Sequence, residues 1–177
     1  MTTTFHISES KGSSGCPFCS SKVKNFEFAG NRDFAAIYNR APILPGHSLV
    51  IPRRHVSRLT ELTEGELCGL FSFARSVTAL LCDVMRAESF DWTLQEGEPA
   101  GQSVAHVHLH VIPRWENDLP NPGDWYPELE KQRQRGSSYE PIDSKERPYL
   151  TTESRDAIVS RLREEAQKRL LRPDGPL

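Results

Sequence analysis

The sequence predicts an α+β domain, in which one main helix packs on an antiparallel sheet of about five strands and a peripheral helix lies near the C-terminus. Three observations lead to this prediction. Residues 102–113 alternate polar and apolar side chains, as a half-buried strand does. Residues 63–86 carry an apolar stripe at helical spacing. Short loops rich in Gly and Pro separate the apolar runs, which favours antiparallel neighbours.

Each element has a local signal. A turn over 30–33 joins the first two strands as a hairpin. Thr63 with Glu66 three residues later forms a capping box, which opens the main helix. Ile158 and Leu162 give the last helix a thin apolar stripe. The other expected elements are strands at 23–29, 34–39, 47–52 and 90–96 and helices at 124–134 and 153–171.

Length and charge limit the possible partners. The 177 residues suit one domain, with a flexible N-terminus over 1–15, the main domain over 16–135 and a C-terminal extension over 136–177. The net charge of −2 gives no bulk attraction to nucleic acid or to an anionic membrane. The sequence shows no apolar run of membrane-spanning length and no hydrophobic signal region. We therefore expect no nucleic-acid partner, no membrane partner and a cytoplasmic location.

Three histidines, His106, His108 and His110, alternate with apolar residues in the expected strand 102–113 and would share one face of it. Three interpretations fit. In the first, they are core residues. In the second, two of them bind a metal ion, since a spacing of about 6.6 Å between neighbouring histidines would strain a site that used all three. In the third, they transfer a phosphoryl or nucleotidyl group through a covalent histidine intermediate. In the third case the middle residue, His108, is the natural nucleophile.

The run from His106 to Ile112 resembles the signature of the histidine triad (HIT) superfamily. Residues 34–50 resemble the nucleotide-binding strand, loop and strand of that family. Residues 95–97 and 100–103 resemble the segments that precede the triad in the Fhit branch, the diadenosine polyphosphate hydrolases, and 125–130 resembles a helix of that branch. The resemblance covers residues of about 23–135 and implies a HIT-like sheet.

The resemblance implies a role for each matching residue. His108 attacks the α-phosphorus, His110 donates to the same phosphate, and Gln95 orients the phosphates and the leaving group. A neutral amide at 95 suits this task, because a carboxylate would repel the substrate. The other implied positions are Asn39 at the ribose, Ile37 and Leu49 against the purine, Gly101, Gln102, Ser103 and Val104 along the phosphate, and His47 behind the nucleophile. Taken alone, Asn39 is typical of a strand-end cap and His47 of a turn.

A second candidate site begins with Cys16 and Cys19, a Cys-x-x-Cys pair in a chain with no secretion signal. The segment around His55 resembles one that supplies a zinc histidine in many bacterial HIT proteins, where the first triad histidine, here His106, is the fourth ligand. The resemblance thus implies a structural zinc ion held by two cysteines and two histidines. The animal Fhit pattern lacks these cysteines, and the alternative is a pair of reduced thiols near the surface.

The expected function is hydrolysis of dinucleoside polyphosphates, such as diadenosine tri- or tetraphosphate, with release of AMP. The resemblance also implies a homodimer and Mg²⁺ bound with the substrate. Two alternatives remain open. One is a HIT nucleotidyl transferase or phosphorylase, in which phosphate replaces water as the acceptor. The other is a nucleotide-binding signalling module with slow turnover.

Overall fold

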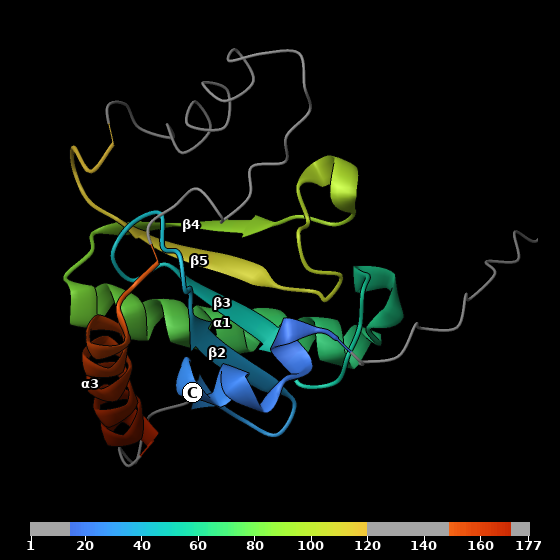
Figure 1. The fold of residues 1–177 in the computed structure, drawn as a ribbon, viewed down its shortest axis with the longest axis horizontal. Coiled ribbons are helices and arrows are strands. Elements are labelled where there is room, and N and C mark those ends of the chain that lie inside the picture. Colours follow the sequence, from blue (N-terminus) through green and yellow to red (C-terminus); the bar gives the residue numbers. More distant parts are fainter. Residues whose placement is uncertain (1–14, 120–148, 171–177) are drawn as a thin grey trace, which may run out of the picture.

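The computed structural model describes residues 15–119 and 149–170 of the chain, and its strands form one sheet (Figure 1). Every neighbouring pair is antiparallel, and the order across the sheet is β1-β2-β3-β5-β4. The five strands are β1 Glu27–Gly30, β2 Phe34–Tyr38, β3 Ser48–Pro52, β4 Ser89–Leu94 and β5 Leu109–Arg114. The predicted fold class, an α+β domain on a five-stranded antiparallel sheet, is confirmed.

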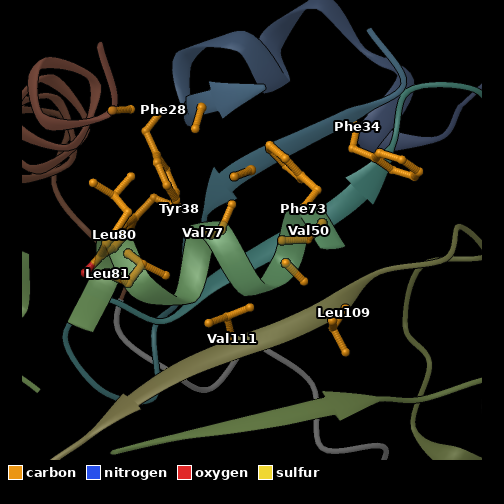
Figure 2. Close-up of a cluster of buried hydrophobic side chains, with 14 of the residues drawn as sticks. Phe28, Phe34, Tyr38, Val50, Phe73, Val77, Leu80, Leu81, Leu109 and Val111 are labelled. Carbon is orange, nitrogen blue, oxygen red and sulfur yellow. The ribbon is translucent and has the colours of Figure 1, made fainter. Parts of the chain in front are cut away.

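Helix α1, Glu64–Met85, lies across one face of this sheet and contacts β2, β3, β4 and β5. Figure 2 shows its buried side chains meeting those of the strands. The helix lies within one residue of the predicted 63–86, and the capping box forms: the Thr63 side chain accepts from the Glu66 amide, and the Glu66 carboxylate accepts from the Thr63 amide. Length and hydropathy alone would let α1 span a membrane, but eight of its residues lie in the core.

Helix α3, Thr152–Leu170, stands beside β1 at the edge of the sheet (Figure 1). Its position is peripheral, as predicted, but Val159, Leu162 and Ala166 are buried in the same core as α1. The described part of the C-terminal extension, 149–170, therefore packs against the main domain. The Arg163 guanidinium also donates to the carbonyls of Lys24 and Glu27, which fixes α3 to the N-terminal part of the chain. The predicted helix at 124–134 lies outside the described residues.

The N-terminal segment differs from its prediction. Strand β1 begins at Glu27, and the residues before it form two 3₁₀ helices, η1 Pro17–Cys19 and η2 Ser21–Asn25. Pro17 suits a first helical turn, and the Ser20 hydroxyl accepts from the Lys22 amide at the start of η2. These local hydrogen bonds replace strand pairing. The segment therefore covers one face of the sheet instead of extending a strand.

The strand predicted over 102–113 begins only at Leu109. The residues before it make other bonds: the His106 amide donates to the Val104 carbonyl in a tight turn, and the Val107 amide donates to the Val56 carbonyl. Only His110 of the three histidines is thus part of β5. The expectation of one continuous strand over 102–113 is wrong, because the chain bends at 104–106 before it joins the sheet. The three rings still gather on one side, since those of His108 and His110 lie next to each other and Phe18 contacts those of His106 and His108.

The sheet has two different faces. Val107, Leu109 and Val111 point into the core beneath α1. On the opposite face a smaller cluster gathers Ala35, Ile37, Leu49 and Ile51, and Phe18, Val23 and Phe26 from the N-terminal segment pack over it. The register pairs Leu49 directly with His110. Directly paired residues share a face, so the histidine of β5 lies on this second face.

Candidate active site and metal centre

His108 is held in one tautomer by the main chain. Its Nδ1 lies 2.6 Å from the carbonyl oxygen of His106. A carbonyl can only accept, so Nδ1 carries the proton and Nε2 keeps a lone pair. Burial lowers the pKa of His108, an effect that the bond to the carbonyl partly opposes. The ring is therefore neutral at physiological pH and has the free nitrogen that a nucleophile requires.

A relay of hydrogen bonds fixes His110. The Ile43 amide donates to Nδ1 of His47 over 3.1 Å, which leaves the proton of His47 on Nε2. That nitrogen lies 2.8 Å from Nδ1 of His110 and donates to it. His110 must then carry its own proton on Nε2, where it can donate to a phosphate oxygen. The rings of His108 and His110 lie next to each other, with centroids 5.1 Å apart.

His47 occupies a different place from the one expected. It was predicted behind the nucleophile, but the hydrogen bond that positions a triad ring goes to His110. The reason is the sheet register, since His47 lies two residues before Leu49, on the same face, and Leu49 pairs directly with His110. Asn39 acts as the strand-end cap that its position suggests, because its Oδ1 accepts from the Ala41 amide. The Nδ2 of Asn39 lies 3.2 Å from Nε2 of His47, the nitrogen that also contacts His110.

Gln95 directly follows β4 and packs against Gly101. A Cβ at position 101 would come within 2.8 Å of the Gln95 Nε2 and push that amide aside, and the φ of +92° at Gly101 favours glycine there. Ser103 is exposed and Val104 half-buried in the turn that follows. The structure thus places Gln95 beside the loop 101–104, as the resemblance implied.

The side chain of Gln102 has a different use from the one predicted. Its Oε1 accepts from the Gly97 amide over 2.8 Å, and its Nε2 lies 3.3 Å from the Ser57 carbonyl and 3.4 Å from the His106 carbonyl. Main-chain groups therefore occupy both ends of the amide. Gln102 holds the loop and the His106 carbonyl in place, and its side chain is not turned along a phosphate path.

The predicted purine wall is covered in the structure. Ile37 and Leu49 are only 4% and 6% exposed, because Phe18 and its neighbours lie over them. The edge-on contacts of Phe18 also reach the rings of His106 and His108, with centroid distances of 5.7 and 5.4 Å. Phe18 is a site residue that the sequence reasoning missed, since its place between the two cysteines does not indicate which face the segment covers.

The four predicted metal ligands come together. Donor atoms of Cys16, Cys19, His55 and His106 all lie within 4.8 Å of one another. The Sγ–Nδ1 distances are 3.5 Å from Cys16 to His106, 3.4 Å from Cys19 to His55 and 3.6 Å from Cys19 to His106. Tetrahedral zinc, with bonds of about 2.3 Å to sulfur and about 2.0 Å to nitrogen, places such atoms roughly 3.6 Å apart. The donor set therefore fits zinc in both chemistry and spacing.

The surroundings of these ligands also suit a metal ion. The Nε2 of His106 lies 2.9 Å from the Pro52 carbonyl and donates to it, so Nδ1 is left with its lone pair toward the cysteines. Burial lowers the pKa of His106 to about 4, which keeps the ring neutral. Burial and the neighbouring Cys16 raise the pKa of Cys19 to about 11. Without a cation the Cys19 thiol keeps its proton at neutral pH, and a metal must displace that proton to bind.

Comparisons with known proteins agree with this geometry. The family model described as the HIT domain matches residues 22–117, more than half of the chain. The bis(5'-nucleosyl)-tetraphosphatase (asymmetrical) of Schizosaccharomyces pombe is 47% identical over 97 residues, which are 55% of this chain and 53% of that protein. The bis(5'-adenosyl)-triphosphatase of Dictyostelium discoideum is 38% identical over 108 residues, 61% of this chain and 72% of that protein.

The fold is also found among solved structures. A hypothetical histidine triad nucleotide-binding protein from Sulfolobus tokodaii superposes with a TM-score of 0.67 and 26% identity, over 92% of this chain and 100% of that one. The chain spans about half the length of the Schizosaccharomyces pombe relative. The match to the family model begins after Cys16 and Cys19, so these two ligands are supported by geometry alone.

Proposed function

The chain belongs to the HIT domain family, and on that basis we propose that it hydrolyses dinucleoside polyphosphates through a nucleotidyl-histidine intermediate on His108. The observation that carries the proposal is the pair of complementary tautomers. His108 is held with its proton on Nδ1 and its lone pair on Nε2, and the adjacent His110 is held with its proton on Nε2. The two curated relatives described above are named as enzymes that act on such substrates.

The reaction has two displacements at one phosphorus atom. The Nε2 of His108 forms a bond to the α-phosphorus, the bond from that phosphorus to the bridging oxygen breaks, and the leaving nucleotide takes the electron pair. The ring becomes cationic, and its Nδ1–H is already bonded to the His106 carbonyl, which stabilises that charge. Water then attacks the phosphorus, the nitrogen–phosphorus bond breaks, and AMP and a proton leave while the ring returns to its neutral form.

Other residues bind and orient the substrate in this proposal. The Nε2 proton of His110 donates to a non-bridging oxygen, and Gln95 faces the leaving group. Gly101, Ser103 and Val104 line the phosphate path with main-chain groups, and Mg²⁺ accompanies the polyphosphate. Asn39 binds the ribose. The base lies against Ile37 and Leu49, and for this the ring of Phe18, which packs over that apolar face, has to turn aside.

We propose zinc for the cluster of two cysteines and two histidines. Zinc bound there would cross-link the N-terminal segment to the chain before β5 and take no part in the chemistry. Metal analysis tests the assignment: the wild-type protein should hold about one zinc per chain, and Cys16→Ser should lose most of it. Zinc content that is the same in both proteins would remove Cys16 from the ligand set. Cys68→Ser, at an exposed cysteine outside the cluster, is the matched control.

We also propose a homodimer formed through β4. This strand is at an edge of the sheet. Its own Phe90 and Phe71 of α1 are 48% and 39% exposed, and both rings contact Trp92. An exposed edge with an aromatic patch is suited to pairing with a second copy. Phe90→Lys should shift the mass measured by light scattering from dimer to monomer. Tyr149→Lys, at an exposed aromatic residue elsewhere, should not, and a monomeric wild type would contradict the proposal.

Product analysis tests the reaction itself. The purified protein is given diadenosine triphosphate or tetraphosphate, with and without inorganic phosphate, and the products are separated. Hydrolysis yields AMP whether or not phosphate is added, whereas ADP that forms only with phosphate would identify a phosphorylase. Tight binding with very slow turnover, together with a cellular effect that survives His108→Asn, would identify a signalling module. His108→Ala should abolish covalent labelling, and retained labelling would refute the nucleophile assignment.

A further inference from the structure

Thr93 lies in a row of side chains that crosses the active face of the sheet. The register pairs Ile37 of β2 with Leu49 of β3, Leu49 with His110 of β5, and His110 with Thr93 of β4. Directly paired residues of antiparallel strands project to the same side. On the other side, the neighbours of Thr93, Trp92 and Leu94, pack against the core beneath α1. Thr93 therefore shares its face with His110.

The hydroxyl of Thr93 is buried and has no hydrogen-bond partner among residues 15–119 and 149–170. No other side chain of that part of the protein has a buried nitrogen or oxygen atom in this condition. The contrast with Thr78 in α1 is clear, because its buried hydroxyl donates to the Ala74 carbonyl and accepts from Nε1 of Trp92. An unpaired buried hydroxyl is unfavourable, so its presence next to a reacting group calls for a role there.

The row also gives the substrate a direction. In the proposed function the nucleoside lies over Ile37 and Leu49, and the phosphorus that is attacked lies over the histidines of the β5 segment. The part of the substrate on the far side of that phosphorus must then extend toward β4. Gln95 follows this strand two residues after Thr93, and the resemblance assigns Gln95 to the leaving group. Thr93 is the next β4 residue on the same face.

We propose that the Thr93 hydroxyl binds the phosphate chain of the leaving group and so favours polyphosphate substrates over other adenylyl esters. This inference rests on the proposed function. As the bond from the α-phosphorus to the bridging oxygen breaks, negative charge accumulates on the departing phosphate, and the hydroxyl donates a hydrogen bond to it. The departing phosphate then supplies the partner that the hydroxyl lacks among the described residues.

Two substrates that share the adenylyl group separate this role from a structural one. Attack on diadenosine triphosphate releases ADP as the leaving group, whereas attack on adenosine 5'-(4-nitrophenyl phosphate) releases a phenolate that carries no phosphate. Thr93→Val keeps the shape and removes the hydroxyl. It should lower kcat/KM about tenfold for diadenosine triphosphate and leave kcat/KM for the nitrophenyl ester within twofold. Thr93→Ser, which keeps the hydroxyl, should retain most activity on both substrates.

Thr78→Val is the control for a lost buried hydroxyl away from the site, and it should lower the melting temperature without changing the ratio of the two kcat/KM values. An equal loss on both substrates in Thr93→Val would assign Thr93 a structural role and overturn the inference. Unchanged kcat/KM on both substrates would show that the hydroxyl does not bind the leaving group, and this result would also overturn the inference. A wild-type protein that hydrolyses neither substrate would refute the proposed function itself, before any variant is compared.

Discussion

Replacing His47 with phenylalanine removes the middle link of the relay that runs from the Ile43 amide to His110. The substitution keeps a ring in a fully buried position but takes away both nitrogens. Nδ1 of His110 then loses the donor that lies 2.8 Å away. Without the His47 donor, the hydrogen bond that holds the proton of His110 on Nε2 is lost, and the tautomer that would meet the phosphate is less favoured.

The size of the effect follows from the bonds that are lost. A buried donor or acceptor left without its partner costs about 1–3 kcal/mol. If His110 donates to the phosphate mainly in the transition state, the loss appears in kcat/KM as roughly a 5- to 150-fold decrease at 25 °C. The Ile43 amide is also left without its acceptor, and that part of the cost should appear as a lower melting temperature.

The assay measures kcat/KM on diadenosine triphosphate together with the tautomer of His110, followed by long-range proton–nitrogen NMR. The matched control is Tyr38→Phe, which removes the hydroxyl that accepts from the Gly46 amide in the same loop and leaves the histidines untouched. We expect Tyr38→Phe to loosen the loop and to keep the tautomer. If His47→Phe stayed within twofold of the wild type and His110 kept its Nε2 proton, the relay would not control the site.

Three further predictions concern stability and the loop of the site. Leu162→Ala should lower the free energy of unfolding by about 2–5 kcal/mol in urea titrations, because α3 buries this residue completely; a loss below about 1 kcal/mol would show that α3 adds little to the core. Arg54 and the capping box hold the pKa of Glu66 at about 2, so Glu66→Gln should lower the melting temperature at pH 7, and the difference should shrink as pH falls from about 4.5 toward 2; a difference independent of pH would exclude the carboxylate as its source. Gln102→Leu should lower kcat more than it raises KM, since the amide supports the His106 carbonyl. A change in KM alone would show that the Gln102 side chain binds the substrate instead.

Elements with local signals were predicted well. The capping box of Thr63 and Glu66 and the apolar stripe of α1 placed that helix to within one residue at each end. Strands β2, β3 and β4 were also found close to their predicted positions. In each case the signal lies in residues a few positions apart, where periodicity and capping act directly. The Cys-x-x-Cys spacing indicated Cys16 and Cys19, but their histidine partners were identified only through the resemblance, because nothing local joins Cys16 to His106.

Contacts between distant segments explain the parts that the sequence did not predict. His106 leaves the sheet because its ring bonds to the Pro52 carbonyl and its neighbour Val107 bonds to Val56, and neither partner can be foreseen from the alternation of residues. The partner of His47 depends on the register between β3 and β5. Thr93 has no sequence signal at all, since it stands out only because its buried hydroxyl makes no hydrogen bond within the described part of the chain.

His106 connects the two sites through different atoms of one residue. Its ring lies beside Cys16 and Cys19, and its carbonyl oxygen accepts a hydrogen bond from Nδ1 of His108 over 2.6 Å. A hydrogen bond this short tolerates little displacement, so a movement of His106 would disturb the tautomer of the nucleophile before it affected the rest of the sheet. The first histidine of the triad can therefore stay outside the chemistry and still control it. Cys16 and Cys19, far from it in sequence, would act on the nucleophile through this residue.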